Sequence, residues 1–128
     1  MNKNLTITSL LGLTAVILGA FASHGLRDVL SIQEMNSLET GIRYQIYHVI
    51  VLLFVNTNNG FSNRLKNRIS IFFFSGILLF SGSIYAIYML GVSVKSIWFI
   101  TPLGGLLLII GWLLMTIFFF KKVINNKK

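Results

Sequence analysis

Long runs without a charged residue limit what this chain can fold into more than any other feature. Residues 5–23, 69–94 and 97–120 contain no Asp, Glu, Lys or Arg. A bilayer core is about 30 Å thick, and a helix of roughly 20 apolar residues crosses it. Only 11% of the chain is charged, against about a quarter in a soluble domain. The chain is therefore expected to lie in a membrane.

A fourth span is expected around residues 46–57, which are apolar but too few to cross a bilayer alone. The span reaches membrane length only if its helix begins near Glu39 or earlier. We therefore expect an all-α integral membrane protein, a four-transmembrane-helix bundle that forms a single membrane domain over residues 1–128. The approximate spans are 5–23, 39–57, 69–91 and 97–120.

The first span has an alternative interpretation as a secretory signal sequence. Lys3 precedes it, and Ala20, Phe21 and Ala22 form a possible cleavage site. The apolar run is longer than the 7–15 residues typical of a signal-sequence core. The sequence favours a retained span, and cleavage stays the alternative.

Basic residues are sorted to one side of the expected membrane. The N-terminal segment, the loop before residue 69 and the tail carry eight Lys and Arg residues, whereas the opposite side carries three. Excess Lys and Arg marks the cytoplasmic side, so both termini are expected in the cytoplasm. Basic residues just beyond apolar spans also favour anionic lipids over nucleic acid as partners. The tail residues expected to contact lipid are Lys121, Lys122, Lys127 and Lys128.

Small residues mark the faces on which helices pack in lipid, because they let backbones approach closely. Such residues recur in three of the four spans. The expected helix-packing glycines are Gly12, Gly19, Gly76, Gly82, Gly104 and Gly105.

All three acidic residues and both histidines lie between residues 24 and 48. The first part of this segment predicts a short interfacial amphipathic segment between the first two helices. Ser31 and Glu34 have the spacing of a capping box, so the second helix is expected to begin near Ser31 or Ser37.

One arc of the second helix is polar. Arg43, Tyr47, Tyr44 and His48 cover about 140° at 100° per residue, and a polar stripe should face the bundle rather than lipid. The opposite arc is apolar except for Gln45. These polar residues form either a plug that fixes the helix in the membrane or a ligand site open to the outer face. The ligand-binding candidates are His24, Glu39, Arg43, Tyr44, Tyr47 and His48.

Four stretches resemble the family known as domain of unknown function 423, whose eukaryotic members are called transmembrane protein 256. They are GAFASHGL at 19–26, LETGIRYQIYH at 38–48, LFSGSIY at 79–85 and ITPLGG at 100–105. The resemblance implies a four-helix membrane protein, in bacteria usually of the inner or plasma membrane, and implies no activity. Gly41 departs from the alanine usual in the family.

The leading hypothesis is a non-enzymatic structural or accessory membrane component, alone, as a homo-oligomer or in a larger complex. One alternative is a small-molecule carrier or binding protein with an outward-facing pocket around His24, Arg43 and His48. A second is a metal or haem accessory protein that uses the two histidines as ligands. No catalytic residues, metal site or cofactor are expected, because the chain has no cysteine and no recognisable nucleophile motif.

Overall fold

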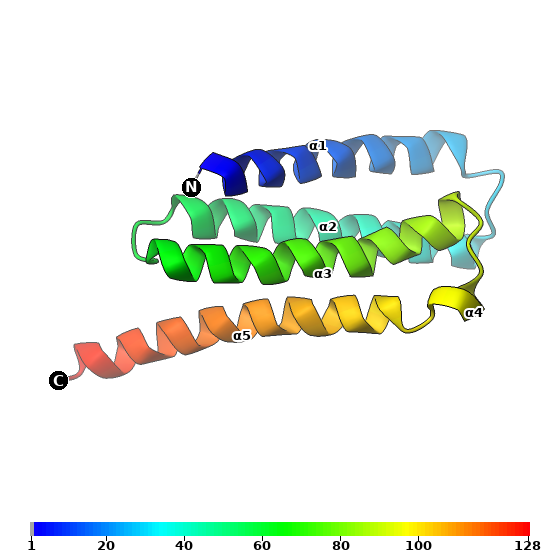
Figure 1. Cartoon of the computed structure of the whole chain (residues 1–128). Coiled ribbons are helices and arrows are strands. Elements are labelled where there is room, and N and C mark those ends of the chain that lie inside the picture. Colours follow the sequence, from blue (N-terminus) through cyan, green and yellow to red (C-terminus); the bar gives the residue numbers. More distant parts are fainter. Residues whose placement is uncertain (1) are drawn as a thin grey trace.

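The computed structural model describes residues 2–128, which form four long antiparallel helices and one short one. The long helices are α1 (Asn2–Gly25), α2 (Ile32–Thr57), α3 (Asn63–Met89) and α5 (Ile100–Asn126), and α4 (Val94–Ile97) is a single turn before α5. Both ends of the chain lie at the same end of the bundle, where α5 projects beyond its neighbours (Figure 1). The expected all-α, four-helix architecture is confirmed.

The surface of the bundle suits lipid rather than water. All four long helices are long and apolar enough to cross a bilayer. Large apolar side chains are exposed along α1, among them Leu10, Leu13 and Val16, and along α5, among them Leu106 and Ile109. A soluble monomer rarely exposes a continuous apolar surface of this extent. These faces are the ones that hydrocarbon would cover.

Helices α2 and α3 form the centre of the bundle, because α2 packs against α1 and α3, and α3 packs against α2 and α5. The main apolar core lies between α2, α3 and α5, and its buried members include Leu52, Phe73 and Leu108. The outer helices α1 and α5 are attached to this centre from different sides.

Glycines bring α3 and α5 into very close contact. A Cβ atom at Gly104 would lie 2.3 Å from the backbone nitrogen of Phe80, and one at Gly76 would lie 2.5 Å from Leu108. The first of these contacts is with backbone, which cannot give way as a flexible side chain can. Gly105 has more room, since a Cβ there would lie 3.8 Å from Phe80.

Glycines on the α1 side meet the side chains of α2 rather than its backbone, at a tight distance for Gly12 and an ordinary one for Gly19. A Cβ atom at Gly12 would lie 3.3 Å from Val49, and one at Gly19 would lie 3.7 Å from Ile42. At Gly82 the only atom within 4 Å of a Cβ would belong to Leu78 of the same helix, at 4.0 Å. A side chain at Gly82 would therefore meet no other helix within 4 Å.

A capping box sets the start of α2. The Ser31 hydroxyl accepts a hydrogen bond from the Glu34 backbone N–H, and the Glu34 carboxylate accepts one from the Ser31 N–H. The expected start near Ser31 is confirmed, and the helix gains a full turn and more ahead of residue 39. The box satisfies N–H groups that a helix start otherwise leaves unpaired.

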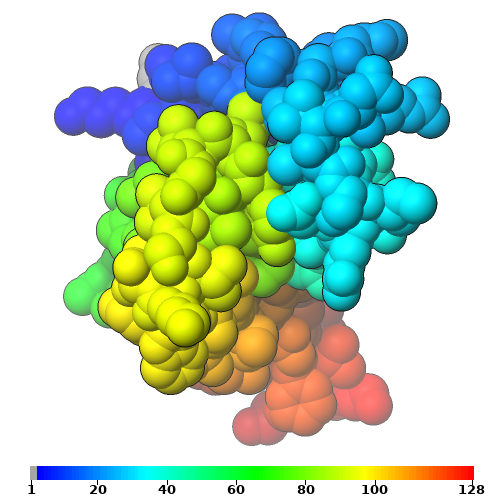
Figure 2. Space-filling model, turned by 90° about the vertical axis from the view of Figure 1, so that its right-hand side faces the viewer, coloured from blue at the N-terminus to red at the C-terminus, as the bar shows by residue number. Residues whose placement is uncertain are grey.

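The connector from α1 to α2 is a tight turn at the end of the bundle opposite the termini, which we call the connector end. Leu26 and Leu30 pack against a second apolar cluster of Ala22, Leu38 and Ile84, whereas Val29 is exposed. Figure 2 looks at this end, where the end of α1 and the connector lie beside the segment that joins α3 to α4. The start of α2 is thus held by packing on both sides.

Candidate functional site

Gln45 joins three helices in the middle of the bundle. Its Nε2 donates to the Leu11 carbonyl at 2.8 Å and to the Thr14 hydroxyl at 3.0 Å, both on α1. Its Oε1 accepts a hydrogen bond from the Tyr85 hydroxyl of α3 at 2.6 Å. The side chain is 2% exposed, so this amide has exchanged water for three protein partners.

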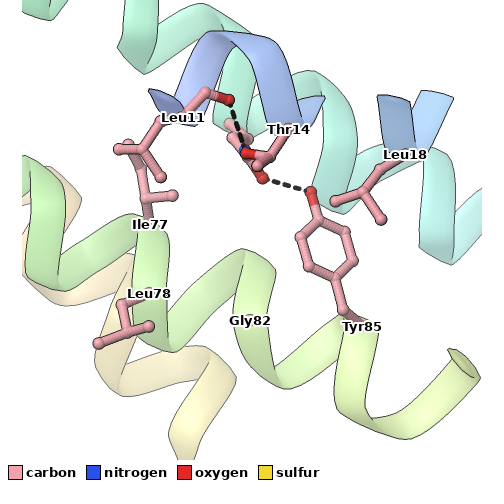
Figure 3. Close-up of a pocket in the computed structure, with 8 residues that line it drawn as sticks. Leu11, Thr14, Leu18, Ile77, Leu78, Gly82 and Tyr85 are labelled. Carbon is pink, nitrogen blue, oxygen red and sulfur yellow. Dashed lines mark hydrogen bonds between the residues drawn. The ribbon is translucent and has the colours of Figure 1, made fainter. Parts of the chain in front are cut away.

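A groove of about 200 Å³ runs between α1 and α3 over these hydrogen bonds (Figure 3). Its walls are largely apolar and come from Leu11 and Leu18 on one side and from Ile77 and Leu78 on the other. Gly82 has no side chain, so the groove is open on its α3 side at this position. The polar atoms at the base of the groove are the Gln45 amide and the groups that already form hydrogen bonds with it.

His48 is buried against α5 with both ring nitrogens engaged. Its Nδ1 lies 2.6 Å from the Tyr44 carbonyl, which can only accept, so Nδ1 carries the proton. Its Nε2 then accepts a hydrogen bond from the Trp112 indole N–H at 3.1 Å. The ring of Phe73 packs beside the imidazole, with 5.1 Å between centroids. A neutral histidine with this tautomer has no lone pair left for a metal.

The two histidines do not share a site. His24 is exposed in the last turn of α1, whereas His48 lies in the interior of the bundle. Across residues 2–128, no three side chains of the metal-ligating types come together. The arrangement gives the metal or haem interpretation no geometric support.

The polar arc of α2 does not face the bundle as expected. Arg43, Tyr44 and Tyr47 are exposed, and only His48 of that arc is buried. The buried face instead follows Leu38, Gly41, Gln45, Leu52 and Asn56, at spacings of three, four and seven residues. Side chains near the membrane surface can reach water from a lipid-facing position, so polarity alone does not turn them inward. The sequence signal for the buried face was the helical spacing of Gly41, Gln45 and Asn56, which are small or amide residues.

Glu39 and Arg43 form a loose ion pair on the outside of α2. The Arg43 Nη1 lies 3.9 Å from the Glu39 Oε2, and both side chains are about half exposed. The Arg43 Nη2 also donates to the Thr40 hydroxyl at 3.1 Å. The two charged residues line a cavity of about 150 Å³ between α1 and α2, with Gly19, Ala22, Ser23 and Ile42 as its other walls. Of the sequence candidates, these two share a cavity.

The end of the bundle that carries the termini holds a closed polar cluster. The Asn4 side-chain amide of α1 donates to Asn56 of α2 and Asn67 of α3, at 3.0 and 2.9 Å. Asn56 in turn donates to the Ser70 hydroxyl at 2.9 Å. The Lys66 ammonium, only 5% exposed, donates to the Asn56 carbonyl at 3.2 Å. We call these residues the asparagine cluster.

Sequence reasoning missed the asparagine cluster, because the stretch from residue 56 to residue 67 reads as an ordinary polar loop. In the sequence, Lys66 is one of three basic residues assigned to this loop, but in the structure its side chain is buried. Its position suits the C-terminal end of α2, where unpaired carbonyls favour a positive charge. Asn56 continues the helical spacing of Gln45 and Leu52, and that spacing could have placed it on the buried face.

Comparison with known proteins places the chain among small bacterial membrane proteins. The family model described as "Protein of unknown function (DUF423)" matches residues 18–105. A UPF0382 membrane protein of Haemophilus influenzae is 41% identical over 88% of this chain and 89% of its own length. One from Staphylococcus epidermidis is 38% identical over 91% and 94%. The UPF0382 inner membrane protein YgdD of Escherichia coli K12 is 35% identical over 88% and 86%. No solved structure matches the chain.

Proposed function

The chain belongs to the DUF423 family of membrane proteins, and on that premise we propose that it acts as a non-enzymatic structural or accessory component of the bacterial inner membrane. The observation that carries the proposal is that the buried polar side chains are hydrogen-bonded within the protein. Within residues 2–128, every buried side-chain nitrogen and oxygen has a hydrogen-bond partner. Polar groups that are all engaged with each other hold helices together and are not free to act on a substrate.

The buried hydroxyls support the same proposal. The Ser81 hydroxyl donates to the Gly41 carbonyl at 2.7 Å, and the Ser83 hydroxyl donates to the Phe80 carbonyl at 2.9 Å. A serine nucleophile needs a general base within hydrogen-bond reach. The Ser81 bond joins α3 to α2. The carbonyl partner of Ser83 is in its own helix, but the Ser83 hydroxyl also lies 2.5 Å from the Thr101 hydroxyl of α5, so both serines help to hold helices together.

The proposal includes an orientation, with both termini in the cytoplasm. The exposed tail lysines, together with Lys3, Arg64 and Arg68, lie at the terminal end of the bundle, where Figure 1 places the ends of the chain. At that end Lys121, Lys122, Lys127 and Lys128 would meet the anionic lipid surface of the inner leaflet. Labelling of an introduced cysteine at Lys128 by a membrane-impermeant reagent in whole cells tests the orientation. Labelling without lysis would contradict it.

The functional test compares folding with fitness. A strain that lacks the protein is complemented with His48→Ala, which leaves the Trp112 N–H without its acceptor, and with His24→Ala as the matched control. We expect His48→Ala to lower the free energy of unfolding by roughly 1–3 kcal/mol, which is measured as a lower melting temperature in detergent. His24→Ala should leave the melting temperature unchanged. Fitness in competition with the wild type should follow the amount of folded protein. A variant that is fully folded and abundant yet fails to complement would overturn the non-enzymatic proposal.

A further inference from the structure

Polar side chains at the connector end are exposed, unlike those in the interior, and several of them have no partner within the protein. The side chains of Ser23, Arg27 and Asn36 make no hydrogen bond or ion pair with any residue from 2 to 128. All three line cavities beside Glu39. One is the cavity of about 150 Å³ that Ser23 and Arg43 share with it, and the other, of about 190 Å³, includes Arg27 and Asn36.

The charges around these cavities have both signs. Glu39 lines both of them, Arg43 lines the first, and Arg27 lines the second. The contact between Glu39 and Arg43 is long, at 3.9 Å, so neither group is saturated by the other. A guanidinium has five N–H donors and pairs well with phosphate oxygens, whereas a carboxylate accepts from an ammonium. The site is therefore complementary to a group that carries a phosphate and an ammonium together.

The depth of the cavities matches the lipid headgroup region. The charge-free run of α1 ends at Ser23, and Arg27 and Glu39 follow at the membrane boundary. The wall of the first cavity is apolar at Gly19, Ala22 and Ile42 and polar at Ser23, Glu39 and Arg43. A ligand that fits both parts has a charged head and a hydrocarbon body.

We propose that the two cavities that share Glu39, one between α1 and α2 and one between the connector and the start of α2, together bind the headgroup of a zwitterionic phospholipid with a primary ammonium, such as phosphatidylethanolamine. Arg43 and Arg27 hold its phosphate, Glu39 holds its ammonium, and its acyl chains lie against the exposed apolar side of α1. A trimethylated ammonium has no N–H to donate, so phosphatidylcholine lacks the contact with Glu39. The capping box and the second apolar cluster keep the site in place by fixing the start of α2 against α1.

The test measures the melting temperature of the full chain in detergent while one lipid is titrated at a time. The lipids are phosphatidylethanolamine, phosphatidylcholine and phosphatidylglycerol with identical acyl chains, and soluble phosphoethanolamine serves as a separate arm. We expect phosphatidylethanolamine to stabilise the wild type at the lowest concentration. Glu39→Gln should raise the concentration needed by about tenfold and abolish the preference over phosphatidylcholine. Arg43→Gln should weaken the effect of both phospholipids.

Two substitutions provide matched controls. Asp28→Asn removes an exposed acid of the connector, and Arg64→Gln removes an exposed guanidinium at the other end of the bundle. Neither residue lines the two cavities, so both variants should titrate like the wild type. Equal stabilisation by all three phospholipids, or by phosphatidylglycerol above the others, would overturn the proposal. An unchanged titration in both Glu39→Gln and Arg43→Gln would also overturn it. If soluble phosphoethanolamine stabilised the protein as well as phosphatidylethanolamine does, the lipid proposal would be wrong and the site would be assigned to a free metabolite.

Discussion

The seam between α3 and α5 and the seam between α1 and α2 join antiparallel helices by different means. Between α3 and α5, Gly104 lets one backbone touch the other, and Gly76 receives the side chain of Leu108. Between α1 and α2, Gly12 and Gly19 meet side chains rather than backbone, and much of the specific attachment comes from hydrogen bonds. The first seam depends chiefly on shape, with one hydrogen bond between Ser83 and Thr101, and the second depends more on polar pairs.

The difference indicates how each seam would fail. A contact between backbones has no slack, so any added atom forces the helices apart. A hydrogen bond in lipid contributes about 0.6 kcal/mol on average, so an attachment made of a few bonds can be loosened one bond at a time. We expect α1 to be the helix that separates most easily from the bundle, and four substitutions test this comparison.

Gly104→Ala should give the largest loss. The new Cβ atom would lie 2.3 Å from the Phe80 backbone nitrogen and 2.8 Å from the Leu79 carbonyl carbon, so α3 and α5 must move apart. Overpacking of this kind costs about 1–3 kcal/mol of unfolding free energy, and the rigid backbone contact places this case at the upper end. Thermal unfolding in detergent measures it. Gly105→Ala is the matched control, and equal melting temperatures for the two variants would refute the claim of a tight seam.

Gln45→Leu should give the next largest loss, roughly 1–2 kcal/mol, because it removes the bonds to Leu11, Thr14 and Tyr85 together. The loss should be concentrated in α1. Hydrogen exchange followed by mass spectrometry should show faster exchange in residues 5–23 and little change in α5. Tyr85→Phe removes one of the three bonds and should show a fraction of the effect. Uniform faster exchange in all helices would contradict a separable α1.

Trp112→Phe should cost about 0.6 kcal/mol for the lost hydrogen bond, since it removes the five-membered ring that carries the N–H bonded to His48 and keeps a six-membered aromatic ring against Phe73. The melting temperature should fall slightly. Trp98→Phe is a suitable comparison because Trp98 is 67% exposed and makes a ring contact with Phe99 alone. Indistinguishable melting temperatures would show that the bond to His48 contributes nothing measurable.

Gly19→Ala should have the smallest effect. A Cβ atom there would lie 3.7 Å from Ile42, an ordinary contact, and alanine is the better helix former. The melting temperature should stay within the equivalent of about 0.5 kcal/mol of the wild type, or rise. A loss as large as that of Gly104→Ala would show that both seams are equally tight and would remove the distinction between them.

The number of long helices and the start of α2 could be predicted from the sequence, because both depend on local chemistry, whereas the single turn α4 was not predicted. Three charge-free runs gave three spans, and Ser31 with Glu34 marked a helix start by their spacing alone. The run from 46 to 57 needed the capping signal to become a full span. Bilayer thickness and helix capping act on the residues themselves, so no tertiary information was required.

The orientation of α2 could not be predicted from polarity. Arg43 and Tyr47 lie near the membrane boundary, where long side chains reach water from an exposed position. Gln45 lies between them in the sequence, but its side chain is shorter and only 2% exposed, so its amide pairs with α1 and α3 inside the protein. The same reasoning applies to Asn56. The partners that neighbouring helices offer to a polar side chain, rather than its polarity, decided which side of α2 faced the bundle, and those partners depend on how the helices are set against each other.

The buried position of Lys66 also has a consequence for the order of events during membrane insertion. Before α2 and α3 pack, its ammonium is one of three basic charges at the start of α3, alongside Arg64 and Arg68, and it can help to retain that end of the helix on one side of the membrane. After packing, the same charge lies against the Asn56 carbonyl, out of contact with lipid phosphates. One lysine thus contributes first to topology and then to the folded state, and its transfer from water marks the closure of this hairpin.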